Sequence, residues 1–136
     1  MTVIVDTCVW SVALRHIRGP ITAEARELEA LVRQGRAAML GIVRQELLSG
    51  IKSRAQFEAL RDTLRDFPDV DVSMEDYELA ASYFNRCRAR GVQGSAIDFL
   101  ICAVSHRRDF AIFTMDRDFV RYSKILGVSL HLPLSN

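Results

Sequence analysis

Short apolar runs along the chain predict the strands of a sheet. The first run, residues 2–5, is rich in β-branched side chains and ends at Asp6 and Thr7, so it predicts a buried strand that delivers a carboxylate to its own carboxyl end. Four later runs are predicted as strands on similar grounds: residues 37–40, 70–72, 109–114 and 128–132.

Between these runs, apolar residues recur every three or four positions, which predicts amphipathic helices. The predicted helices span residues 8–16, 22–34, 43–50, 54–67, 73–90, 95–104 and 119–124. The first is expected to end at the Arg18-Gly19-Pro20 segment. Alternating strands and helices favour an α/β fold, an α/β/α sandwich around a mostly parallel central sheet, with residues 1–136 forming a single domain.

The composition is that of an ordinary globular protein, with 49% hydrophobic and 26% charged residues. No apolar run reaches the roughly 18 residues of a membrane span, and the N-terminus lacks the charged and apolar regions of a signal peptide. We therefore expect a cytoplasmic protein that does not contact a membrane. Cys8, Cys87 and Cys102 are odd in number and widely spaced, which favours reduced thiols over a disulfide framework or a zinc site.

Four acidic residues are predicted to meet at one edge of the sheet. The carboxyl ends of parallel strands share an edge, so Asp6, Glu46 and Asp116, which follow three predicted strands, are expected there. Asp98 opens a helix that runs antiparallel to the strand after it, so the start of that helix lies beside the same edge. The sequence thus predicts a four-carboxylate cluster built from four separate segments.

Such a cluster favours a bound cation, because two like charges about 4 Å apart repel by roughly 4 kcal/mol at an effective dielectric of 20. Oxygen ligands without His or Cys suit Mg²⁺ or Mn²⁺. A solvated divalent ion activates water and neutralises charge on a phosphate, so the pattern points to phosphodiester hydrolysis. The net charge is +1, but without the four acids 18 basic residues face 13 acidic ones, a mildly basic balance compatible with nucleic acid.

Each acid also has a purely structural interpretation. Asp6 is a suitable helix cap, residues 95–98 match a capping box, and Asp116 and Asp118 suit a turn. Glu46 alone fits a solvated helix face. Their convergence on one edge favours the site interpretation, since independent caps would fall at either edge.

Four segments in order resemble the motifs of PIN-domain ribonucleases, most closely the VapC-type toxins of bacterial toxin–antitoxin pairs. They are residues 3–7, 46–50, 98–103 and 114–119. The resemblance covers nearly the whole chain. It departs from the family's pattern at Cys8, where many relatives have a small hydroxyl or amide residue.

The resemblance implies an α/β/α fold, Mg²⁺- or Mn²⁺-dependent endoribonuclease activity, a homodimer, and neutralisation by a cognate VapB-type antitoxin. It implies that four acids are catalytic and bind the metal: Asp6, Glu46, Asp98 and Asp116. Three further residues are implied to assist them: Thr7, Thr114 and Asp118. Asp116 is chosen over Asp118 as the metal-facing residue because it is nearer the end of its strand.

Other classes of protein fit less well. A phosphatase with an aspartyl nucleophile usually has a second Asp two residues after the first, where Cys8 stands, and a dinucleotide-binding domain needs a glycine-rich first turn. The alternative is a non-toxin PIN-fold nuclease or a non-catalytic RNA- or protein-binding module. A binding module has no reason to gather four acids.

Overall fold

A computed structural model describes residues 1–14 and 21–133 of the chain. Its centre is a sheet of three parallel strands in the order β2-β1-β3: β1 (Val3–Val5), β2 (Ala37–Ala38) and β3 (Ala111–Phe113). Val3, Ile4 and Val5 are all buried, as expected for a central parallel strand that is covered on both faces. Register pairs Val5 with Phe113, so β1 and β3 end side by side.

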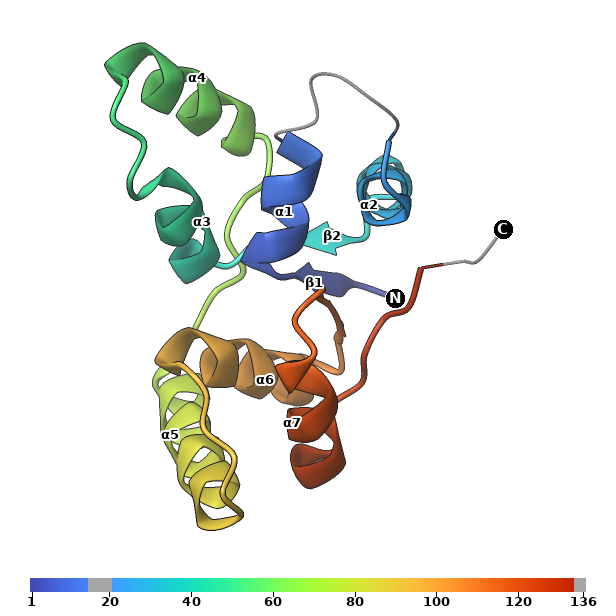
Figure 1. Ribbon diagram of the computed structural model, residues 1–136, viewed down its shortest axis with the longest axis vertical. Coiled ribbons are helices and arrows are strands. Elements are labelled where there is room, and N and C mark those ends of the chain that lie inside the picture. Colours follow the sequence, from blue (N-terminus) through green and yellow to red (C-terminus); the bar gives the residue numbers. More distant parts are fainter. Residues whose placement is uncertain (15–20, 134–136) are drawn as a thin grey trace.

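Helices cover both faces of this sheet (Figure 1). One side carries α1 (Thr7–Leu14), α2 (Ala23–Arg33), α3 (Gly41–Leu48) and α4 (Arg54–Leu64). The other side carries α5 (Met74–Ala89), α6 (Ala96–Arg108) and α7 (Asp118–Leu126). The predicted α/β/α sandwich with a parallel sheet is therefore confirmed. None of the described helices is long and apolar enough to cross a membrane.

The predicted helices agree with the structure to within a few residues at most ends. The predicted end of the first helix at residues 15–16, and the Arg18-Gly19-Pro20 segment after it, lie outside the described residues. Residues 99–105 of α6 are all buried, which makes α6 the central helix of its layer. Asp109 caps α6 in the left-handed conformation, with φ of 56°, so β3 begins later than predicted.

Two of the predicted strands are wrong. Next to residues 70–72, the described pairing is a single bridge between Met39 and Asp69. The carbonyl of Asp71 accepts a hydrogen bond from the Arg108 side chain in place of a neighbouring strand. At residues 128–132, pairing is again a single bridge, between Leu130 and Ile112. Pro133 follows, and because proline has no N–H it cannot continue a ladder.

A buried ion-pair network joins α5 to α6. Asp76, in the first turn of α5, is fully buried and accepts a hydrogen bond from the Ser73 N–H at 2.8 Å, as the capping box predicts. Its carboxylate also accepts hydrogen bonds from Arg107 and Arg108, each at 2.9 Å. The hydrogen bonds from Arg108 chiefly hold the pKa of Asp76 well below its usual range.

We expect Asp76→Asn to lower the free energy of unfolding by about 3 kcal/mol, because a neutral amide leaves two partly buried arginines without a counter-charge. The folded-state pKa of Asp76 is depressed, so its stabilising effect is full above the unfolded-state pKa of about 3.9 and is lost as pH falls below it. Urea denaturation at pH 7 and pH 3 measures both effects. Glu78→Gln, at an exposed position of α5, is the control, and equal midpoints for wild type and Asp76→Asn at pH 7 would contradict the expectation.

Candidate active site

Asp6 is fixed at the point where β1 ends and α1 begins. Its N–H donates to the Phe113 carbonyl at 2.9 Å, which continues the pairing of β1 with β3 by one residue. The Asp6 side chain is only 7% exposed. Its carboxylate accepts hydrogen bonds from the Thr7 N–H at 2.8 Å and from the Thr114 hydroxyl at 2.7 Å. Asp6 thus holds the start of α1 and is at the same time a buried carboxylate at the sheet edge.

The Thr114 hydroxyl links Asp6 to the loop after β3. It donates to Asp6 Oδ2 and accepts a hydrogen bond from the Asp116 N–H at 3.0 Å. Cys8 Sγ lies 3.6 Å from the same Asp6 oxygen and accepts from the Met115 N–H at 3.3 Å. These contacts lock the carboxyl ends of β1 and β3 together, although the two segments are 108 residues apart.

Asp116 and Asp118 both lie in the exposed turn that opens α7. Asp116 Oδ1 accepts a hydrogen bond from the Asp118 N–H at 2.9 Å, which is the turn geometry expected of an Asp at this position. The charge of Asp116 also raises the pKa of Asp6. The charge of Asp116 therefore acts on Asp6, and its carboxylate also stabilises the turn.

Asp98 reaches the site from the start of α6. Its N–H donates to the Ser95 hydroxyl at 3.1 Å, so Ser95 caps the helix as predicted. Its carboxylate Oδ2 accepts a hydrogen bond from the Tyr122 hydroxyl at 2.9 Å. The sequence motifs do not predict a site role for Tyr122, which belongs to the apolar stripe of α7. The available signal was chemical: a buried tyrosine normally finds a partner for its hydroxyl.

The carboxyl groups of Asp6 and Asp98 are both difficult to ionise in this protein. Burial is the largest cause and raises the pKa of each. The charge of Asp6 raises the pKa of Asp98 further, which places the two carboxylates within electrostatic reach of each other. A bound cation would offset both burial and repulsion.

Glu46 comes from α3. It is exposed on α3, a helix that contacts α1 and is held by Arg44, whose guanidinium donates to Asp69 and to the carbonyls of Leu64 and Phe67. Within residues 1–14 and 21–133, no hydrogen bond or ion pair joins Glu46 to the other three acids. Hydrogen bonds through Thr114 link Asp6 to Asp116, and the charge of Asp6 acts on Asp98, whereas no such link to Glu46 is found in the described part of the chain.

The donor set nevertheless fits a hard divalent cation. No group of three or more His, Cys, Asp or Glu residues in the described part of the chain is arranged to hold a metal ion. Mg²⁺, however, keeps several waters and is usually bound by only one or two carboxylates together with substrate phosphates. Asp6 and Asp98, both oxygen donors, meet that requirement.

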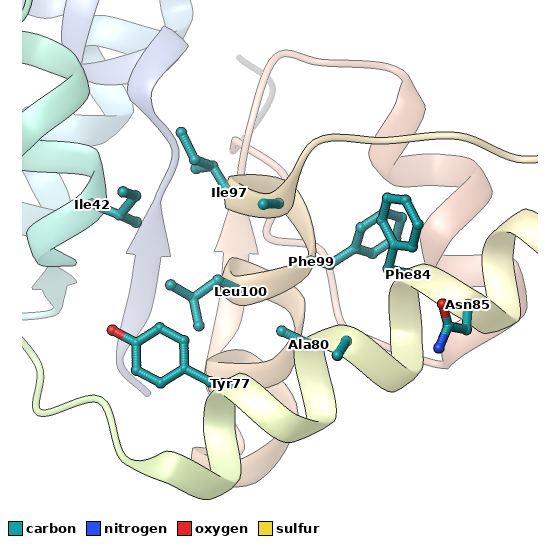
Figure 2. A pocket seen from close by; sticks show the side chains of 10 residues that line it. Ile42, Tyr77, Ala80, Phe84, Asn85, Ile97, Phe99 and Leu100 are labelled. Atoms are coloured by element: carbon teal, nitrogen blue, oxygen red, sulfur yellow. The ribbon is translucent and has the colours of Figure 1, made fainter.

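An apolar pocket of about 400 Å³ adjoins the start of α6 (Figure 2). Ile42 of α3 lines it on one side, and side chains of α5 and α6 line the rest, among them Tyr77, Phe84 and Leu100. Phe99 lies beside Phe84 in the same wall, with ring centroids 5.7 Å apart. The pocket contains no acidic residue, so it is separate from the carboxylates of the site.

Comparison with known proteins places the chain in a family. The PIN domain family model matches residues 3–125. The chain therefore belongs to the PIN domain family, as its sequence motifs suggested. No curated protein sequence gives a significant match.

Several solved structures share the fold over nearly their whole length. VapBC2 from Rickettsia felis, bound to a DNA fragment from its promoter, has a TM-score of 0.78 at 20% identity and covers 96% of this chain and 98% of its own. FitAcB from Neisseria gonorrhoeae has a TM-score of 0.76 at 18% identity, covering 97% and 98%. A toxin–antitoxin complex from Klebsiella pneumoniae has a TM-score of 0.67 at 18% identity, covering 99% and 100%. At these identities the likeness establishes the fold.

Proposed function

We propose that this protein is a metal-dependent endoribonuclease that hydrolyses RNA phosphodiester bonds and acts as the toxin of a toxin–antitoxin pair. One observation supports the nuclease most directly. In a chain of the PIN domain family, the buried carboxylate of Asp6 lies within electrostatic reach of Asp98 and Asp116 at the carboxyl edge of a parallel sheet. This is where ligands bind in open α/β folds.

In this proposal, residues 1–136 form a single nuclease domain, and Mg²⁺ or Mn²⁺ is held by Asp6 and Asp98, with Glu46 and Asp116 completing the acidic group. When bound, the ion supplies a water of lowered pKa and neutralises charge on the phosphate. Asp116 and Glu46 are both exposed, whereas Asp6 is buried. Asp118 assists through its backbone N–H, which donates to Asp116 Oδ1.

Thr114 and Thr7 orient Asp6 for this role. The Thr114 hydroxyl and the Thr7 N–H each hold one oxygen of the Asp6 carboxylate, so the group keeps one orientation without a cation. Among the described residues, the Thr7 hydroxyl is one of two buried polar side-chain groups without a hydrogen-bond partner. A buried hydroxyl without a partner is costly, and a polar group bound beside Thr7 would satisfy it.

The toxin role is supported by the likeness to structures described as VapBC2, FitAcB and a toxin–antitoxin complex. We propose by analogy that the chain pairs with a VapB-type antitoxin, forms a homodimer and works in the cytoplasm. Its substrate is RNA.

We expect the purified protein to cleave RNA with Mg²⁺ or Mn²⁺ and to be inactive in excess chelator. Glu46→Gln should lower the rate by orders of magnitude without changing the melting temperature, because an amide is a poor ligand for a hard cation and the side chain is exposed. Glu29→Gln, the same change at an exposed position of α2, is the control and should cleave like the wild type. Gel analysis of labelled RNA measures all three proteins.

Persistent cleavage in chelator, from a preparation free of contaminating nuclease, would contradict metal dependence. Full activity of Glu46→Gln would remove Glu46 from the site and leave the role to the three aspartates. A protein that binds RNA but never cleaves it would indicate a non-catalytic module.

A further inference from the structure

A buried tyrosine from the last helix holds one of the site's carboxylates. Tyr122 is fully buried, and its hydroxyl donates to Asp98 Oδ2 at 2.9 Å, across 24 residues of sequence. Its other contact, with the Gln93 carbonyl, is at the limit of a hydrogen bond at 3.5 Å. The bond to Asp98 is therefore the one that satisfies this hydroxyl.

The ring of Tyr122 is fixed by aromatic neighbours. Its centroid lies 4.9 Å from that of Phe99 and 5.1 Å from that of Phe119, both of them buried. Phe99 is in turn packed edge-on against Phe84 at the pocket wall (Figure 2). Because its ring is held by close packing, the position of the hydroxyl is determined by the core and not by the solvent.

Gly94 provides the space in which the hydroxyl sits. A Cβ atom at this position would lie 2.3 Å from the Tyr122 hydroxyl oxygen and 2.8 Å from Cζ. Any side chain at position 94 would therefore displace either the tyrosine or the loop that leads into α6. A glycine before the helix and a tyrosine from α7 thus form one arrangement around Asp98.

We propose that Tyr122 is a positioning residue for Asp98, holding its carboxylate ready for the divalent cation, and that Gly94 is required for this contact. The inference rests on the function proposed above. A phenylalanine would fill the same volume, so packing alone does not explain the hydroxyl. Partners that orient a metal ligand in this way commonly change metal affinity by 10–100-fold.

The test is Mn²⁺ binding to the full-length protein, measured by calorimetry. Tyr122→Phe should bind Mn²⁺ about tenfold more weakly than the wild type. Its RNA cleavage should return close to the wild-type rate when Mn²⁺ is raised to saturation, which a loss of folding would not allow. Tyr83→Phe is the matched control, because Tyr83 is also buried but packs against His106 and Arg86, and its affinity should be unchanged.

Two further variants keep the proposal falsifiable. Gly94→Ala, which retains the hydroxyl but displaces it, should weaken Mn²⁺ binding as Tyr122→Phe does. Asp98→Asn should weaken it more than either. Wild-type affinity in both Tyr122→Phe and Gly94→Ala, with binding lost in Asp98→Asn, would overturn the positioning role and leave the proposed function intact. A wild-type protein that binds no Mn²⁺ would overturn the proposed function, and this proposal with it.

Discussion

Replacing Asp6 with Asn is expected to remove RNA cleavage while leaving the metal-free protein at least as stable as the wild type. The loss of activity follows from chemistry, because Asp6 is the most buried of the site's acids and a neutral amide holds a hard cation poorly. Asn has nearly the same shape as Asp. Its oxygen can accept from the Thr7 N–H, and its amide can donate to Thr114, so the local geometry survives.

The expected stability follows from the direction of the pKa shift. Burial raises the pKa of Asp6 in the folded protein. The folded state therefore favours the protonated carboxyl, and any stability that this group contributes is present at low pH and is lost as pH rises through the folded-state pKa. At neutral pH the buried, ionised carboxylate costs stability. A neutral Asn avoids that cost and also removes repulsion with Asp98 and Asp116. Added Mg²⁺ should raise the melting temperature of the wild type, since a ligand of the folded state stabilises it, and should barely raise that of Asp6→Asn.

Melting curves with and without Mg²⁺, together with cleavage assays, measure these effects. Asp71→Asn is the control, because Asp71 is exposed and its contact with Arg108 is made by the backbone carbonyl, which the change leaves in place. An Asp6→Asn protein that melts well below wild type without metal, yet responds to Mg²⁺ like wild type, would reduce Asp6 to a structural helix cap.

The central part of the candidate site can be predicted from the sequence because it depends on backbone topology. A β-branched run ending in Asp6, and another ending at Thr114, become neighbours once the strands are parallel and adjacent. Asp98 follows from the direction of α6 relative to β3. These features depend on periodicity and on the shared edge of parallel strands, both of which can be read along the chain.

The features that escaped prediction depend on how helices rotate and pack. The bond from Tyr122 to Asp98 requires α7 to turn one residue of its apolar stripe toward the start of α6. The pairing of Asp76 with Arg107 and Arg108 likewise requires the start of α5 to meet the end of α6. The predicted strands at 70–72 and 128–132 are wrong because a short apolar run cannot show whether the partner strand is long enough to pair with.

Production of this protein alone in a bacterial host is expected to arrest growth, and co-production of a small partner encoded beside it is expected to restore growth. A nuclease turns over, so even a low level destroys many RNA molecules, whereas a partner that covers the acidic edge blocks every turnover. The proposed toxin role therefore predicts that arrest depends on the site. Wild type should arrest growth, Asp6→Asn should not, and Asp71→Asn should arrest it fully.

Growth curves and viable counts after induction measure the effect, with immunoblots to show equal amounts of each protein. Arrest by Asp6→Asn as strong as that by wild type would mean that the protein harms the cell by binding rather than by cleaving. Normal growth with abundant, folded wild-type protein that still cleaves RNA in vitro would favour a housekeeping nuclease over a toxin. Arrest that needs the acidic site and is relieved by the neighbouring partner is the combination that only the toxin role produces, since a housekeeping nuclease would have no dedicated inhibitor and a binding module would not depend on Asp6.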